Sequence, residues 1–153
     1  MTTGWVLGIL TVFLVHEFGH AVLARLVGAH VYRIDLLPYG GECTTSETDS
    51  ELKESIIASG GVLAQLALAI PAELALASGP PAALGDILWA LSTTSVLIAA
   101  FNLLPIPPLD GAKAWKLVWL IPIWAFERLR RRRSRRLETS ETRRPPPKKE
   151  WLN

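Results

Sequence analysis

The chain has 153 residues, of which 50% are hydrophobic, a mean hydropathy of +0.28 and a formal net charge of +2. This length predicts one domain. Cys43 is the only cysteine, which excludes an intrachain disulfide and gives no indication of the redox compartment. The small net charge conceals an asymmetry, because eleven of the sixteen Lys and Arg residues lie between Arg128 and Lys149.

Three apolar blocks, at residues 5–27, 56–77 and 83–104, are each long enough to cross a hydrocarbon slab of about 30 Å as a helix. A helix satisfies its own backbone hydrogen bonds in lipid, so we expect three spanning helices. The first block could instead be a secretory signal peptide, but it lacks a basic n-region, is too long and contains two histidines and a glutamate. We therefore expect an all-α polytopic membrane protein.

The connections between these blocks carry other signals. Residues 31–42 mix β-branched and aromatic side chains and end in two glycines, which predicts a short strand or hairpin between the first two helices. Asp49 or Ser50 then marks a helix start. Residues 114–126 are apolar, rich in Trp and too short to span, which predicts an interfacial or re-entrant C-terminal helix. A distorted fourth crossing is the alternative.

Basic residues predict the topology. The connection after the first block contains Arg25, Arg33 and Lys53, whereas residues 1–4 and 78–86 contain neither Lys nor Arg. The N-terminus is therefore expected outside and the C-terminus in the cytoplasm, with the plasma membrane as the simplest location. We expect residues 1–126 to form the core and residues 127–153 a basic, disordered tail. Directly after membrane segments, the arginine run predicts contact with an anionic bilayer surface and no nucleic-acid partner.

The first block contains the sequence His-Glu-Phe-Gly-His at residues 16–20. Positions i and i+4 share a helix face, so His16 and His20 can present two imidazole nitrogens to one metal ion. Glu17 can then act as general base toward an attacking water. A pair of core histidines is the alternative. An apolar spanning helix disfavours it, because ionisable groups without partners are costly to bury in hydrocarbon.

A catalytic zinc site normally has three protein ligands and an open position for water. The available candidates for the third ligand are His30, Cys43, Glu73, Asp86 and Asp110. At about 1.5 Å per residue, His16 and His20 lie toward the cytoplasmic end of the first helix, as does Asp110 after the third. Glu73 and Asp86 lie near the outer ends and are expected to snorkel to the interface. Depth therefore selects Asp110.

A second observation favours Asp110 as the third ligand. Three prolines between residues 105 and 108 prevent the third helix from continuing, so that the segment can fold back into the bundle. The alternative is that Asp110 caps the helix that begins near residue 114.

Three motifs now stand in a definite order: HEFGHAVLAR at residues 16–25, LPYGG at residues 37–41 and NLLPIPPLDG at residues 102–111. In order, spacing and helical context, the sequence resembles the site-2 protease family of intramembrane zinc metalloproteases. The resemblance covers roughly residues 5–120, and the two outer motifs together are highly specific.

The resemblance implies roles for individual residues. One zinc ion would be bound by His16, His20 and Asp110, and Glu17 would activate the water. An edge strand that pairs with an unwound substrate segment would be formed by Leu37, Pro38, Tyr39, Gly40 and Gly41, in agreement with recognition by strand addition. Asn102 matches the family's asparagine and would orient the scissile backbone or the aspartate; a helix–helix hydrogen bond is the alternative.

One stretch departs from the family pattern. The second core helix usually carries Ala-Gly-Pro followed by Asn, whereas here the corresponding residues are Ser59, Gly60, Gly61 and Gln65. Gln65 keeps the amide donors and acceptor but is one methylene longer, so substrate positioning and rate are expected to be affected. The two glycines are also explained simply as small residues that allow close helix packing.

We therefore expect metal-assisted hydrolysis of a peptide bond within or near the transmembrane segment of a membrane protein. The expected partners are this substrate, the bilayer and a regulatory or adaptor protein. One alternative is a catalytically weak or inactive metal-binding scaffold of the same fold, which the departure at Gln65 favours. Another is a small transporter or adaptor that uses the intramembrane His and Glu residues as an ion relay and needs neither tight zinc nor Asp110.

Overall fold

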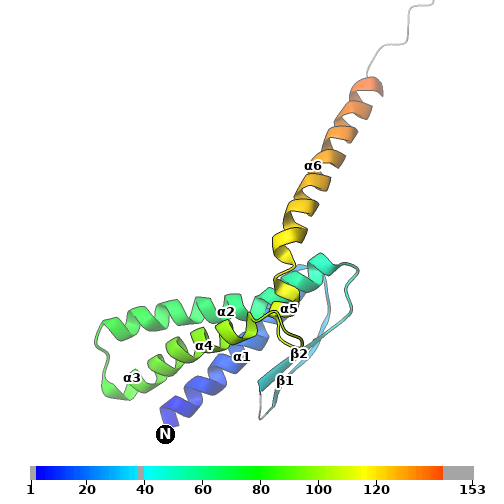
Figure 1. The fold of residues 1–153 in the computed structure, drawn as a ribbon. Helices are drawn as coiled ribbons and strands as arrows, with labels where there is room; N and C mark the ends of the chain where they lie inside the picture. Colours follow the sequence, from blue (N-terminus) through cyan, green and yellow to red (C-terminus); the bar gives the residue numbers. More distant parts are fainter. Residues whose placement is uncertain (1–2, 38–39, 143–153) are drawn as a thin grey trace, which may run out of the picture. The chain divides into compact units, whose positions relative to one another are not determined.

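The computed structural model describes residues 3–37 and 40–142, without the side chains of residues 83 and 136–142. The contacts between residues divide the chain into two units, residues 1–117 and 118–153. The predicted limit of the core at residue 126 stays a prediction. The helical core, with one hairpin between its first two helices, lies in the first unit (Figure 1).

Three helices of the described chain are long and apolar enough to cross a membrane, as predicted. Two of them are continuous, α1 (Thr3–Leu26) and α2 (Glu51–Ala77). The third consists of α3 (Ala82–Trp89), a π-helical turn η1 (Ala90–Thr94) and α4 (Ser95–Asn102). The start of α2 also agrees with prediction, because the Ser50 hydroxyl accepts a hydrogen bond from the Lys53 N–H at 3.3 Å.

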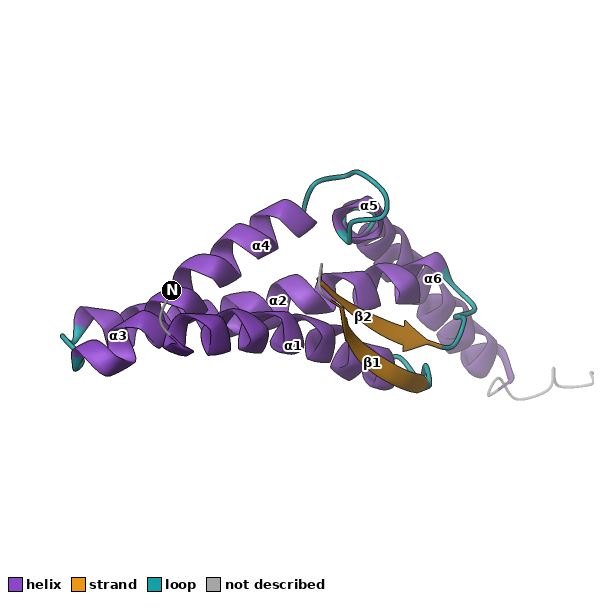
Figure 2. Cartoon of the chain, turned by 90° about the horizontal axis from the view of Figure 1, so that it is seen from below, coloured by secondary structure: helices purple, strands orange, loops and turns teal. Residues whose placement is uncertain are grey.

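The predicted hairpin is present between α1 and α2. Strands β1 (Val31–Leu37) and β2 (Gly40–Thr45) pair antiparallel, with Leu37 opposite Gly40, and lie beside α1 (Figure 2). The expectation that residues 37–41 form one edge strand is therefore wrong, since β1 ends and β2 begins within that segment. The antiparallel pairing requires the chain to reverse here. Pro38 and Tyr39 lie outside the described residues.

The core of the first unit consists mostly of small residues. Apart from Val12 and Val62, its buried hydrophobic side chains are all alanines, whereas many large apolar side chains, such as Leu10, Phe18 and Ile70, are exposed. Small residues inside and large apolar residues outside are typical of helices that pack against each other in lipid. This pattern supports the membrane assignment independently of helix length.

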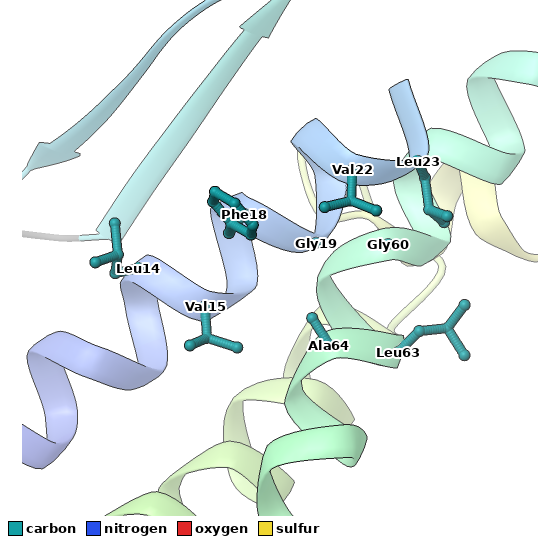
Figure 3. Close-up of a pocket in the computed structure, with 9 residues that line it drawn as sticks. All are labelled: Leu14, Val15, Phe18, Gly19, Val22, Leu23, Gly60, Leu63 and Ala64. Carbon is teal, nitrogen blue, oxygen red and sulfur yellow. The ribbon is translucent and has the colours of Figure 1, made fainter. Parts of the chain in front are cut away.

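The backbones of α1 and α2 approach closely at Gly19 and Gly60. A Cβ atom on either glycine would collide with the backbone of the other. An apolar groove of about 430 Å³ lies between α1 and α2 at this crossing. Its lining includes Phe18, Val22 and Leu63 (Figure 3). The two glycines therefore set the distance between the helices that carry the histidines and their partners.

The C-terminal region differs from prediction. A short helix α5 (Gly111–Ala114) precedes α6 (Leu117–Thr142), so residues 127–142 are helical and not disordered. The physical reason is composition: Arg, Leu and Glu favour helix, and Glu127 pairs with Arg131 one turn later at 3.9 Å. Residues 143–153 lie outside the described part of the chain. An interfacial or re-entrant position for residues 114–126 stays a prediction.

Gly60→Ala is expected to force α1 and α2 apart and to destabilise the fold by about 1–3 kcal/mol, as overpacked cores generally do. Thermal unfolding in detergent measures the effect. Gly85→Ala is the matched control, because a Cβ at Gly85 meets nothing within 4 Å and both changes replace a helical glycine. Equal stability of the two variants would contradict the role given to the crossing.

Candidate metal centre

Side chains from two distant parts of the sequence meet at the C-terminal half of α1 (Thr3–Leu26). The Nε2 atoms of His16 and His20 are 3.1 Å apart. Oδ2 of Asp110 lies 3.0 Å from Nε2 of His16 and 3.2 Å from Nε2 of His20. Among the described residues, only these three form a group of His, Cys, Asp or Glu side chains that could hold a metal ion.

The three distances fit one tetrahedral zinc ion. Nitrogen and oxygen ligands lie about 2.0–2.1 Å from zinc, and two ligands of a tetrahedron are then about 3.3 Å apart. Both imidazoles are buried, with 6% and 8% of their residues' surface exposed. Two imidazoles and one carboxylate are also the ligand set of many catalytic zinc sites, which keep a fourth position for water.

The second ring nitrogen of His20 has a defined partner. Nδ1 lies 2.8 Å from the carbonyl oxygen of Ile57 in α2, so this nitrogen carries the proton and donates it to the carbonyl. The Nε2 lone pair is then directed at His16 and Asp110. Such an outer hydrogen bond orients a metal ligand and raises its basicity. Ile57 could not be predicted from the sequence, because the acceptor is a backbone atom.

Gly61 leaves room for the ring of His16. A Cβ atom at this position would collide with the imidazole, and it would lie 2.6 Å from Nδ1. Gly60 therefore allows the helices to approach, whereas Gly61 accommodates a ligand. The sequence predicts both glycines as packing residues. This describes Gly60 correctly but does not include the space that Gly61 leaves for the His16 ring.

The chain after α4 folds back, as the prolines predict, and brings Asp110 to the histidines. Gly111 packs directly on the backbone of Leu103 and Leu104, where a Cβ would collide. The indole Nε1 of Trp115 donates to the Leu103 carbonyl oxygen at 2.6 Å. Asp110 occupies the N-cap position of α5, but its side chain makes no capping hydrogen bond. Its carboxylate lies at the histidines, so the capping alternative is wrong for the side chain.

The charge of Asp110 suits a metal ligand. Burial by itself raises the pKa of this carboxyl, but the adjacent imidazoles of His16 and His20 outweigh burial and lower the pKa from 3.8 to about 2. Asp110 is therefore a carboxylate at neutral pH, and no proton has to leave it before a cation binds.

Glu17 lies beside this cluster and is in contact with the hairpin. Only 5% of its surface is exposed, and a Cβ at Gly41 would collide with its side chain. The backbone N–H of Cys43 is near the Glu17 carboxylate. Strand β2 therefore positions the predicted general base. The sequence predicted Gly41 only as a substrate-binding residue and gave no signal for the Cys43 amide.

The remaining predicted substrate-binding residues have different surroundings. The Asn102 amide donates to the Ile98 carbonyl oxygen of its own helix at 3.1 Å, which is neither of the two bonds expected for it. Leu37 and Gly40 pair at the end of the hairpin. Gln65 is 0% exposed, and neither of its amide atoms has a hydrogen-bond partner within the described part of the structure.

The other candidate ligands have different surroundings. Burial, and then the nearby Glu17 carboxylate, raise the pKa of the Cys43 thiol, which disfavours the thiolate that a metal needs. Glu73 accepts a hydrogen bond from the Ser92 hydroxyl of η1. This contact differs from the expected snorkelling. His30 lies edge-on to Tyr32, with ring centroids 5.1 Å apart.

Comparison with known proteins agrees with this geometry. The sequence model of the peptidase M50B-like family matches residues 2–106. Rip3 of Mycobacterium tuberculosis, assigned as a zinc metalloprotease, is 34% identical over 120 residues, which are 71% of this chain and 30% of Rip3. The sll0528 protein of Synechocystis, assigned likewise, is 30% identical over 128 residues, or 78% of this chain and 34% of its own.

A solved structure shares the fold. The site-2 protease from Methanocaldococcus jannaschii superposes with a TM-score of 0.58 at 25% identity, over 74% of this chain and 52% of the other. The chain belongs to the M50B-like peptidases, the site-2 protease family of membrane metalloproteases. It is a multi-pass membrane protein of this family and spans about a third of the length of the two relatives.

Asp110→Asn and His16→Ala are each expected to abolish near-stoichiometric zinc binding, because two remaining ligands cannot hold the ion tightly. Metal analysis of protein purified in detergent measures zinc per chain. His30→Ala is the control, since its ring contacts Tyr32 and not the cluster. Full zinc retention by Asp110→Asn would exclude this residue as the third ligand.

Proposed function

We propose that the chain is a zinc metalloendopeptidase that hydrolyses a peptide bond within or near the transmembrane segment of a membrane protein. The observation that carries this proposal is the placement of Glu17 beside the group of His16, His20 and Asp110. A structural metal site needs no general base, whereas hydrolysis does. Family membership supports the same reaction class.

The chemistry is divided between the metal and the chain. Zinc, when bound by the two histidines and the aspartate, would polarise the scissile carbonyl and promote ionisation of water. Glu17 is the residue that takes the proton from the attacking water and delivers it to the leaving amine. The nearby Cys43 N–H would help to hold the carboxylate of Glu17 in place for both transfers. Residues 103–110 hold the third ligand at the same depth as the histidines.

The hairpin is the proposed substrate-recognition element. A peptide bond inside a helix is shielded, so the substrate must be extended locally before attack, and an extended chain can pair with a strand. The contacts of β2 with Glu17, through Gly41 and Cys43, would align such a segment with the general base. Leu37, Pro38, Tyr39 and Gly40 would contact the substrate at the end of the hairpin, and Asn102 from the end of α4.

The orientation of the protein in the membrane is inferred from the distribution of its basic residues. We propose that the protein lies in the plasma membrane with its N-terminus outside and its C-terminus in the cytoplasm. Arginines of α6 would then lie at the anionic inner surface, where Arg128 also stacks on Trp124, 4.8 Å from the ring centroid. Selection of substrates would rest on the bundle itself, on the tail, or on a regulatory or adaptor protein.

Glu17→Gln is expected to retain zinc and to lower peptide hydrolysis by about 10²–10⁴-fold, the usual contribution of a general base. Zinc content and cleavage are measured together, with a panel of single-span membrane segments that contain helix-destabilising residues as substrates. Glu47→Gln, at an exposed position, is the control. A wild type that binds zinc and cleaves no segment would favour the metal-binding scaffold.

Gly41→Ala is expected to displace Glu17 and lower hydrolysis at least about tenfold, or about 1.4 kcal/mol of barrier, with zinc content unchanged. The comparison variant is Glu42→Ala, because the neighbouring Glu42 side chain is exposed. If Gly41→Ala cleaves at the wild-type rate, the contact between β2 and the general base has no catalytic role.

A further inference from the structure

The two histidines of the metal centre differ in their outer partners. Nδ1 of His20 donates to the Ile57 carbonyl oxygen at 2.8 Å. Nδ1 of His16 is buried and has no hydrogen-bond partner among the described residues. A histidine that binds a metal almost always donates a proton from its other ring nitrogen, because that bond fixes the tautomer and the ring orientation. His16 therefore needs an acceptor that the backbone of α2 does not supply.

Gln65 has a buried amide that also needs hydrogen-bond partners. Its side chain is completely buried, and both amide atoms are without a partner in the described part of the chain. A buried amide that makes no hydrogen bond is costly, so it is retained where it has a specific contact to make. An amide oxygen accepts hydrogen bonds and carries no charge.

The helix places the two groups together. Gly61 faces His16 so closely that a Cβ there would lie 2.6 Å from Nδ1. Gln65 follows Gly61 by four residues in α2, and residues at this spacing share a face with their Cβ atoms about 5–6 Å apart. Helical side chains tilt toward the N-terminus of their helix, so a Gln65 rotamer directed over Gly61 would bring the amide to the imidazole.

We propose that Gln65 is a positioning residue for His16: its amide oxygen accepts the Nδ1–H and so directs Nε2 at the metal. This inference rests on the zinc site of the proposed function. It replaces the substrate contact expected for Gln65, because a side chain with no exposed surface is not available to a substrate.

The test is the zinc affinity of the full chain in detergent, measured by competition with a chelator and independent of any substrate. Gln65→Leu removes the acceptor at similar volume and is expected to weaken zinc binding about 10–100-fold, as for other outer partners of metal ligands. Gln65→Glu keeps an acceptor at the same reach and is expected to restore the affinity. Gln65→Asn is expected to bind zinc less tightly than wild type, because its amide is one methylene shorter.

Ser95→Ala is the matched control, because the Ser95 hydroxyl is also fully buried and without a partner among the described residues. It is expected to bind zinc as the wild type does. Wild-type affinity in both Gln65→Leu and Gln65→Asn would overturn the proposal, as would equal losses in Gln65→Leu, Gln65→Glu and Ser95→Ala, which would indicate core packing. Absence of zinc from the wild type would instead overturn the proposed function and this inference together.

Discussion

The close crossing of α1 and α2 at Gly19 and Gly60 is the contact on which the site depends. It brings α2 near enough for the Ile57 carbonyl to bind His20 and for Gly61 to lie against His16. In lipid, where apolar surface gives helices no preference for each other, such backbone approach is a main source of association. The packing that joins the helices therefore also forms the surroundings of the two histidines.

The ionisable groups of the metal centre lie in contact with one another or with the hairpin. The carboxylate of Asp110 reaches both imidazoles, and Glu17 lies near a strand amide. Hydrocarbon would make each group costly alone, so the cluster is stable only as a set with its cation or proton. The segment that delivers Asp110 is held by backbone contacts of Gly111 and by the Trp115 indole. Its irregular shape is tolerated because it is anchored to protein.

The hairpin connects recognition to chemistry. Gly41 and Cys43 are next to the Glu17 side chain. An extended segment bound along β2 would therefore have a fixed position relative to the general base. The same two contacts make strand β2 part of the site and not only a docking edge. Residues 38–39 lie outside the described part of the chain, and their proposed part in recognition follows from the sequence motif alone.

The sequence by itself determined the three spans, the hairpin, the pair His16 and His20 with Glu17, and the return of the chain at Asp110. Each follows from a local rule: apolar length, turn residues, i and i+4 spacing, or prolines that end a helix. Only the tertiary structure decided which neighbours orient these groups. Ile57 and Cys43 act through backbone atoms, and Gly61 acts through the absence of a side chain. The composition of the sequence and the spacing of its motifs therefore do not reveal these contacts. The helical continuation to Thr142 was also missed, because a charge-rich, proline-containing tail resembles disorder by composition, whereas residues 127–142 favour helix.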